Sequence, residues 1–270
     1  MSEPTIRRVG IIGLGAIGRR VLEALQTQHL PSASYAVVDR MQHPEAFTGS
    51  RHLTLFSDVR SLIDWQPDLV IECAGHGAVV DAVPACLRAG IDVVIASIGA
   101  LADRALREDL EQAANAGKAR LILVSGAIGG LDAIRSARAA GLDEVIYIGR
   151  KPPQAWGGTP ADDVFDLASI DEPTTIFRGS AAQASVLFPK NANVTAAVAL
   201  SGVGFELTQV QLIADPGVHK NVHEVQARGA FGELSIRLIN NPLPDNVKTS
   251  WLAALSIEEA VAKQLQALVF

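Results

Sequence analysis

A glycine-rich turn near the start of the chain carries a clear chemical pattern. The segment GLGAIG places Gly13, Gly15 and Gly18 at the spacing G-x-G-x-x-G, between a predicted strand and a predicted helix. In such a turn the first glycine permits the tight bend and the second lets a pyrophosphate approach the backbone. The third allows close packing of helix on strand. The pattern predicts that this turn, with Ala16 and Ile17 inside it, binds a dinucleotide.

An acidic residue at the end of the next predicted strand fits the same cofactor. Asp39 lies 21 residues beyond Gly18, where a carboxylate can bind the adenosine ribose. Its charge would repel a 2′-phosphate, which favours NAD. Arg40 follows directly and could instead bind that phosphate, so NADP stays open as the alternative cofactor.

Two more strand ends are expected to border the nicotinamide half of the cofactor. Cys73 and Ala74 follow the fourth predicted strand, and Ser97 follows the fifth. Ligands of open α/β sheets bind at these carboxyl edges. No activating base for Cys73 is evident in the sequence, so we expect it to pack against the cofactor or in the core.

A histidine suits proton transfer near neutral pH, because its ordinary pKa is about 6.5. The chain has six histidines: His29, His43, His52, His76, His219 and His223. The first three are expected in loops or at exposed helix ends, whereas His76 could face the cofactor cleft. His219 and His223 belong to the segment DPGVHKNVHE in the second half of the chain, where a substrate would meet the nicotinamide.

The spacing of the last two histidines permits a rival interpretation. On a helix, His219 and His223 would share one face, as in a zinc site. Pro216 and Gly217 disfavour a helix just before them, the following residues alternate as in a strand, and no third ligand is evident. We therefore expect no metal.

The elements that must position these residues alternate between strand and helix in the first half of the chain. This rhythm predicts a parallel sheet with helices on both faces. The expected strands are Arg7–Gly15, Ser34–Asp39, Leu53–Asp58, Pro67–Gly75, Ile91–Ser97 and Ala119–Gly126. The expected helices are Ala16–Gln28, Val59–Gln66, Ala78–Ala89 and Ala102–Ala116.

The second half begins with one more predicted helix, within Ala127–Leu142, and then becomes rich in alternating polar and apolar residues. Such alternation is typical of half-buried antiparallel strands. The expected strands are Asp143–Lys151, Thr174–Ser180, Phe205–Asp215, Asn221–Gly229 and Gly232–Asn240, with helices near Ala161–Leu167 and Asn193–Leu200. A final helix, capped by Thr249 or Ser250, would bury a face that includes Trp251 and Leu255.

The fold class is therefore α/β: a Rossmann dinucleotide-binding domain followed by an α+β domain with a mixed or antiparallel sheet. We expect residues 1–127 to form the first domain, completed by a C-terminal helix within 246–270. Residues 128–245 would form the second, substrate-binding domain.

The composition limits the kinds of partner that the protein can bind and the cellular compartment that it suits. The net charge is −6, which gives no indication of a nucleic-acid or anionic-membrane surface. The two cysteines, Cys73 and Cys86, suit a reducing compartment. Four glycines interrupt the apolar stretch Val9–Arg20, which argues against a secretory signal, and no apolar run approaches the length of a membrane span. The expected location is the cytoplasm.

Several longer segments resemble the L-aspartate dehydrogenase family. They are VSGAIGGLDAI (Val124–Ile134), GRKPPQAW (Gly149–Trp156), FPKNANVTAAVALSGVG (Phe188–Gly204), ADPGVHKNVHEV (Ala214–Val225) and the stretch Gly229–Ser256. These segments are more specific than the glycine turn, and the resemblance extends over nearly the whole chain.

The resemblance implies NAD(P)-dependent, reversible oxidation of L-aspartate to iminosuccinate, which hydrolyses to oxaloacetate and ammonia and can supply NAD synthesis. It implies a catalytic role for His223 and cofactor contacts from Ala127 and Asn193. It also implies a homodimer whose second domain carries the substrate and the dimer contact.

A dicarboxylic substrate requires cationic or N–H donors. Lys190, three residues before Asn193, is the preferred candidate, and His219 is a second. Arg150, Lys151, Arg178 and Lys220 are further candidates. Two alternatives stay open: a related dehydrogenase or reductase of the homoserine or dihydrodipicolinate type, and a dinucleotide sensor without turnover.

Overall fold

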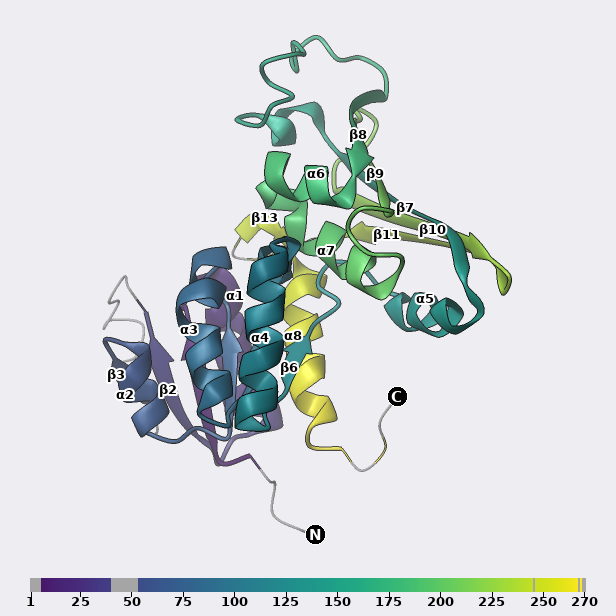
Figure 1. Ribbon diagram of the computed structural model, residues 1–270. Coiled ribbons are helices and arrows are strands. Elements are labelled where there is room, and N and C mark those ends of the chain that lie inside the picture. Colours follow the sequence, from purple (N-terminus) through teal and green to yellow (C-terminus); the bar gives the residue numbers. More distant parts are fainter. Residues whose placement is uncertain (1–5, 40–52, 245, 267, 269–270) are drawn as a thin grey trace. The chain divides into compact units, whose positions relative to one another are not determined.

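The computed structural model describes residues 6–39, 53–244, 246–266 and 268. The chain divides into two compact units. The first contains Met1–Val124 and Ala254–Phe270, and the second contains Ser125–Ala253 (Figure 1). Each unit is built on its own sheet.

The first unit contains a six-stranded parallel sheet. Its strands are β1 (Arg8–Ile12), β2 (Ser34–Val38), β3 (Leu53–Phe56), β4 (Leu69–Glu72), β5 (Asp92–Ile95) and β6 (Leu121–Leu123). Their order is β3-β2-β1-β4-β5-β6, the Rossmann order, which reverses direction between β1 and β4. The central strands are apolar and buried, as strands covered on both faces must be. The predicted fold class is confirmed.

Helices cover both faces of this sheet. They are α1 (Ala16–Ala24), continued by a wider turn at Leu25–His29, α2 (Val59–Asp64), α3 (His76–Arg88) and α4 (Arg104–Gly117). Right-handed crossovers place α1 on one face and α2, α3 and α4 on the other, because the chain crosses the sheet in opposite directions on the two sides of β1. Figure 1 shows α3 and α4 side by side, and an ion pair between Arg88 and Asp109 joins them.

The C-terminal helix α8 (Trp251–Lys263) packs on the first unit through a polar contact. Glu258 is 5% exposed, and its carboxylate lies 3.2 Å from the Arg20 guanidinium of α1. Ala254, Ile257 and Val261 share the buried side. The expected buried face was therefore wrong, because Trp251 and Leu255 are exposed and the helix turns its smaller residues inward around Glu258.

The helix begins at Trp251, directly after Ser250, which is one of the two capping residues expected. The earlier part of the segment 246–270 is not helical, because Asn246–Ser250 form strand β13, which pairs with β12 (Pro242–Leu243). Pro242 and Pro244 favour a tight reversal here, so the chain makes a short hairpin before the helix begins.

The second unit contains a five-stranded mixed sheet. Its strands are β7 (Leu142–Lys151), β8 (Thr174–Ser180), β9 (Gln209–Ala214), β10 (Asn221–Gly229) and β11 (Gly232–Asn240). Their order is β11-β10-β7-β9-β8, and only β7 and β9 run parallel. Successive side chains along each strand point to opposite faces of the sheet. This alternation determines which residues can share a site.

Helices α5 (Leu131–Ala137), α6 (Ala181–Leu187) and α7 (Ala192–Ser201) accompany this sheet. The helix expected near Ala161–Leu167 was wrong, since these residues form successive turns. Helix α6 was not predicted, although a capping box marks its start: Ser180 accepts from the Gln183 amide, and the Gln183 side chain accepts from the Ser180 amide. Its seven residues are too few for a clear apolar period.

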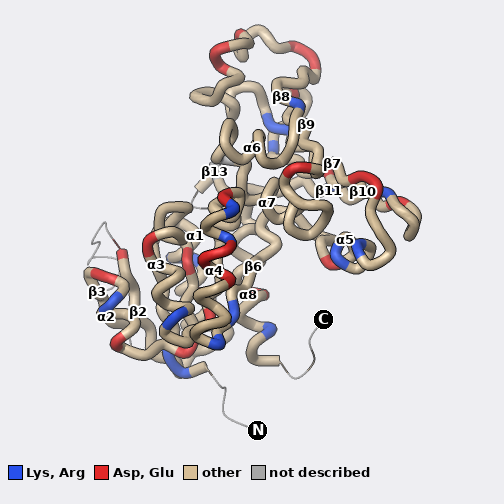
Figure 2. Tube along the Cα trace, viewed as in Figure 1, with Lys and Arg blue, Asp and Glu red and all other residues tan. Residues whose placement is uncertain are grey.

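Charged residues of both signs are mixed in the view of Figure 2, notably along α4. Within the described residues, no helix combines the length and the apolar character that a membrane crossing requires.

The Glu258 contact gives a test of how α8 is held. In Glu258→Ala we expect the free energy of unfolding to fall by about 1–3 kcal/mol, because removal of a buried carboxylate leaves Arg20 without its partner. Urea unfolding at neutral pH measures this change. Glu259→Ala is the matched control, since Glu259 is exposed and pairs with Lys263 one turn along, an ion pair that contributes roughly 0.3–0.5 kcal/mol. Equal losses in the two variants would contradict the assignment.

Candidate functional site

The glycine turn has the geometry that a dinucleotide requires. Gly13 has φ +89°, and a Cβ on it would lie 2.5 Å from Cβ of Ala74. A Cβ on Gly18 would lie 2.2 Å from the Gly13 carbonyl oxygen, so helix and strand could not pack as closely with a larger residue. A Cβ on Gly15 would meet nothing within 4 Å, and this is the open approach that a pyrophosphate needs.

A cavity of about 480 Å³ opens beside this turn, at the reversal of strand order between β1 and β4. It brings together five of the predicted cofactor residues: Gly13, Gly15, Asp39, Cys73 and Ala74. His76, at the start of α3, also lines it. Its position and its lining fit a dinucleotide. Arg40, like His43 and His52, lies outside the described residues.

A buried carboxylate joins the loop after β4, which lines this cavity, to the loop after β5. Glu72 ends β4 and is fully buried. One carboxylate oxygen accepts from the amides of Ala74 and Gly75, each at 2.7 Å. The Ser97 hydroxyl donates to the same oxygen and the Ser97 amide donates to the other. Burial raises the pKa of Glu72, while these hydrogen bonds act to lower it.

Ser97 is therefore placed in this unit as the partner of Glu72, and its exposed fraction is 6%. No sequence pattern pointed to Glu72, which is the last residue of an otherwise apolar strand. Burial, with a smaller effect from the Glu72 charge, raises the pKa of Cys73. The thiol is thus kept protonated, in agreement with the expectation that Cys73 is not a nucleophile.

His223 lies on β10 of the second unit, at a position set by strand pairing. In the antiparallel pair β10–β7, His223 is opposite Gly149, so its neighbours on the same face are Tyr147 and Lys151, two residues to either side of Gly149. A Cβ on Gly149 would lie 2.9 Å from the Tyr147 hydroxyl oxygen. The missing side chain at position 149 thus leaves room for this hydroxyl.

The imidazole is held through one ring nitrogen. Nδ1 of His223 lies 2.8 Å from the Tyr147 hydroxyl oxygen, and the rings lie nearly parallel, with centroids 6.0 Å apart. Burial, reinforced by the Lys151 charge, lowers the pKa of His223 to about 3. Burial raises the pKa of Tyr147. Both rings are therefore neutral at physiological pH, and His223 is available as a proton acceptor.

Lys151 completes this cluster. Its ammonium donates to Oδ1 of Asn191 at 2.7 Å and lies 5.1 Å from the centroid of the Trp156 ring. Asn191 is 6% exposed, and a hydrogen bond from its side chain acts to lower the pKa of Tyr147, against the larger effect of burial. Tyr147, Lys151, Asn191 and His223 are named the β7–β10 cluster below. Of these four residues, the sequence predicts a catalytic role for His223 and offers Lys151 as one of several candidate cations, whereas no sequence pattern points to Tyr147 or Asn191.

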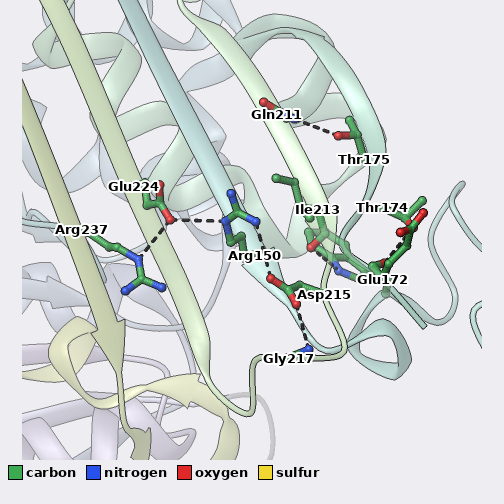
Figure 3. A network of polar contacts seen from close by, with 11 residues as sticks. Arg150, Glu172, Thr174, Thr175, Gln211, Ile213, Asp215, Gly217, Glu224 and Arg237 are labelled. Carbon is green, nitrogen blue, oxygen red and sulfur yellow. Dashed lines mark hydrogen bonds and ion pairs between the residues drawn. The ribbon is translucent and has the colours of Figure 1, made fainter. Parts of the chain in front are cut away.

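The opposite face of the same sheet carries a separate set of ion pairs. Figure 3 shows Arg150 between Asp215 and Glu224, with Arg237 on the far side of Glu224. Because successive residues of a strand face opposite sides, Arg150 and Lys151 are directed to different faces. Arg150 is engaged with carboxylates of the chain itself, and Lys151 lies on the His223 side.

The other predicted residues are placed as follows. Ala127 is buried in the second unit, and its carbonyl accepts from Asn240. Asn193 is exposed in the first turn of α7. His219 is exposed in the turn before β10, and Arg178 and Lys220 are exposed. The side chain of Lys190 lies outside the described part of the structure.

The zinc interpretation of His219 and His223 required a helix, whereas His219 lies in a turn and His223 in a strand. Within the described ranges, no three residues of the metal-binding types form a group that could hold an ion.

A Rossmann sheet with a cavity beside its glycine turn, followed by a unit that carries a buried histidine, defines the class of two-domain, NAD(P)-dependent oxidoreductases. Two protein families match the chain accordingly. The family described as "Homoserine dehydrogenase, NAD binding domain" matches residues 13–124, and "Aspartate dehydrogenase, C-terminal" matches residues 132–264.

Full-length relatives define the family more narrowly. The chain is 47% identical to an L-aspartate dehydrogenase of Polaromonas sp. over 97% of its length and 99% of that protein, and 43% identical to one of Pseudomonas aeruginosa over 96% and 97%. A crystal structure of aspartate dehydrogenase from Thermotoga maritima superposes with a TM-score of 0.79 at 28% identity, covering 98% of this chain and 99% of that one. The chain belongs to the L-aspartate dehydrogenase family.

One further structure shares only the fold. Dihydrodipicolinate reductase from Paenisporosarcina superposes with a TM-score of 0.54 at 14% identity, over 97% of this chain and 95% of that one. At this identity the likeness shows no common activity.

The buried, neutral His223 predicts a specific loss of stability in acid. In the unfolded chain His223 becomes protonated below about pH 6.5, whereas in the folded chain it becomes protonated only near pH 3. The contribution of the neutral imidazole to the free energy of unfolding is therefore complete above pH 6.5 and is lost as the pH falls toward 3. Relative to His223→Gln, the wild type should lose about 2 kcal/mol of unfolding free energy between pH 7.5 and pH 5, measured by urea unfolding. Parallel stabilities of the two proteins over this range would contradict the neutral, buried state.

Proposed function

We propose that the protein oxidises L-aspartate with NAD or NADP to iminosuccinate, which hydrolyses to oxaloacetate and ammonia, and that it also runs in reverse. The observation that carries the proposal is the β7–β10 cluster, in which a neutral imidazole and an ammonium occupy one face of a sheet. The names and the near-complete coverage of the relatives support the choice of aspartate.

The cofactor supplies hydride acceptance when bound. The glycine turn would hold its pyrophosphate through Gly15 and the first amides of α1, which include those of Ala16 and Ile17. Asp39 would bind the adenosine ribose, and this carboxylate supports NAD over NADP. Ala127 and Asn193 contribute further cofactor contacts in this proposal.

His223 manages the protons that the substrate releases. When Nδ1–H of the imidazole donates to the Tyr147 hydroxyl oxygen, Nε2 carries a lone pair and accepts a proton. Loss of hydride from Cα and of a proton from the amino group leaves the imine, and water then adds to its carbon. In the reductive direction the same nitrogen returns the proton.

The proposal extends to the setting of the enzyme. We place it in the cytoplasm, consistent with two free cysteines, as a homodimer whose second unit carries the dimer contact. Its product imine can feed NAD synthesis. These three statements rest on the composition and on the resemblance.

Replacement of His223 tests the activity. In His223→Ala we expect kcat for aspartate oxidation to fall about 10²- to 10⁴-fold, since the proton acceptor is lost. Binding of NAD, followed by fluorescence titration, should stay within about twofold of the wild type, because the glycine turn belongs to the other unit. Steady-state assays of reduced-cofactor absorbance give kcat, and an unchanged kcat would remove His223 from the reaction.

A further inference from the structure

We propose that Glu72 is a positioning residue for the cofactor, which acts through the loop after β4 and not by direct contact. The inference rests on the proposed function only for the identity of the ligand, a nicotinamide dinucleotide. The three residues that follow Glu72 line the cavity beside the glycine turn. Glu72 itself has an exposed fraction of 0%, so a ligand in the cavity meets the loop and not this carboxylate.

Four hydrogen-bond donors surround the Glu72 carboxylate. One oxygen accepts from the amides of Ala74 and Gly75, each at 2.7 Å. The Ser97 hydroxyl donates to the same oxygen at 3.0 Å, and the Ser97 amide donates to the other oxygen at 3.1 Å. An ionised carboxylate can accept from all four. A side-chain amide at this position would have to turn its own N–H toward at least one backbone N–H.

The contact with Gly75 holds the backbone where helix α3 begins. Gly75 has φ +118°, a conformation that glycine adopts readily, but one among many that it can adopt. Its amide donates to Glu72, and its carbonyl accepts from the amides of Ala78 and Val79 in the first turn of α3. Glu72 therefore fixes the direction of the chain at the point where His76, the next residue, lines the cavity.

The contact with Ala74 links Glu72 to the glycine turn. A Cβ on Gly13 would lie 2.5 Å from Cβ of Ala74 and 2.8 Å from its amide nitrogen, so loop and turn are packed without spare room. The same amide donates to Glu72, while the Cys73 amide donates to the Ile12 carbonyl at 2.8 Å. Because the loop lies directly against the turn, its displacement changes the position or the freedom of the backbone that receives the pyrophosphate.

Calorimetric titration with NAD, in the absence of substrate, tests the proposal without turnover. Glu72→Met removes both acceptor oxygens and keeps an unbranched side chain, so the dissociation constant for NAD should rise about tenfold or more. Glu72→Gln retains one acceptor oxygen and should restore part of the affinity, to within about threefold of the wild type. Asp68→Asn is the matched control, because Asp68 precedes the same strand at its other end and accepts from the amides of Arg7 and Arg8. Its dissociation constant should stay within about twofold.

Alkylation of Cys73 by iodoacetamide, followed by mass spectrometry, reports on the same loop without the cofactor. Cys86→Ala leaves Cys73 as the one remaining thiol of the chain. Both Glu72 variants remove the charge that contributes to the raised pKa of Cys73, so a difference in rate between them reports on the hydrogen bonds alone. Since Glu72→Met frees the loop more than Glu72→Gln does, Cys73 should react about tenfold faster in Glu72→Met.

Far-ultraviolet circular dichroism and urea unfolding confirm that each variant is folded under the conditions of the assays. Wild-type affinity for NAD in folded Glu72→Met, or equal rates of Cys73 alkylation in the two Glu72 variants, would overturn the positioning role. An equal loss of affinity in Asp68→Asn would also overturn it, because the effect would then not depend on the carboxyl end of the strand. A wild type that binds NAD but does not reduce it with aspartate would overturn the proposed function and leave the positioning role standing.

Discussion

The pairing of β10 with β7 is the constraint on which the chemistry of the second unit depends. It sets His223 opposite Gly149 and thereby between Tyr147 and Lys151 on one face of the sheet. A slip by one residue would turn every one of these side chains to the other face. The imidazole would then meet the set of ion pairs around Arg150 instead of a phenol and an ammonium. Strand register is thus a determinant of the protonation state of His223.

Buried polar groups organise both units in a similar manner. In the first unit, Glu72 accepts from the backbone of two loops and ties the carboxyl end of β4, which lines the cavity, to the carboxyl end of β5. In the second, Tyr147 and Asn191 hold His223 and Lys151. Each contact replaces the water that a polar group loses on burial. The apolar strands supply the stability of the sheets, and these few polar contacts determine the geometry at their edges and faces.

Much of the fold could be predicted from the sequence, because the governing signals are local. The glycine turn, the buried strands and the charged helix Arg104–Gly117 each carry their own pattern, and the order β3-β2-β1-β4-β5-β6 follows from the crossover rule once the strands are known. Errors occurred where the signal was short or ambiguous. The Ala161–Leu167 segment has a helical composition but forms turns, and α8 buries Glu258 where an apolar face was expected.

The candidate site was predictable only in part for a related reason. Gly13, Gly15 and Asp39 share a motif and lie along one cavity, so sequence spacing sufficed to find them. Tyr147, Lys151 and Asn191 are brought to His223 by pairing of strands far apart in the chain and by the start of α7, and no spacing within a single segment encodes this. Strand alternation within the segment Gly149–Lys151 places Arg150 and Lys151 on opposite faces of the sheet. The sequence alone does not show which of these two faces carries His223.

The most direct test of the account is the crystal structure of the dead-end complex with NADH and L-aspartate, which binds substrate but cannot react. The account predicts that Nε2 of His223 lies within about 3.2 Å of the amino nitrogen of aspartate, or of a single water bound to it, while Nδ1 keeps its contact with Tyr147. Aspartate bound next to the nicotinamide with the His223 imidazole out of reach of its amino group, and with no such water, would contradict it.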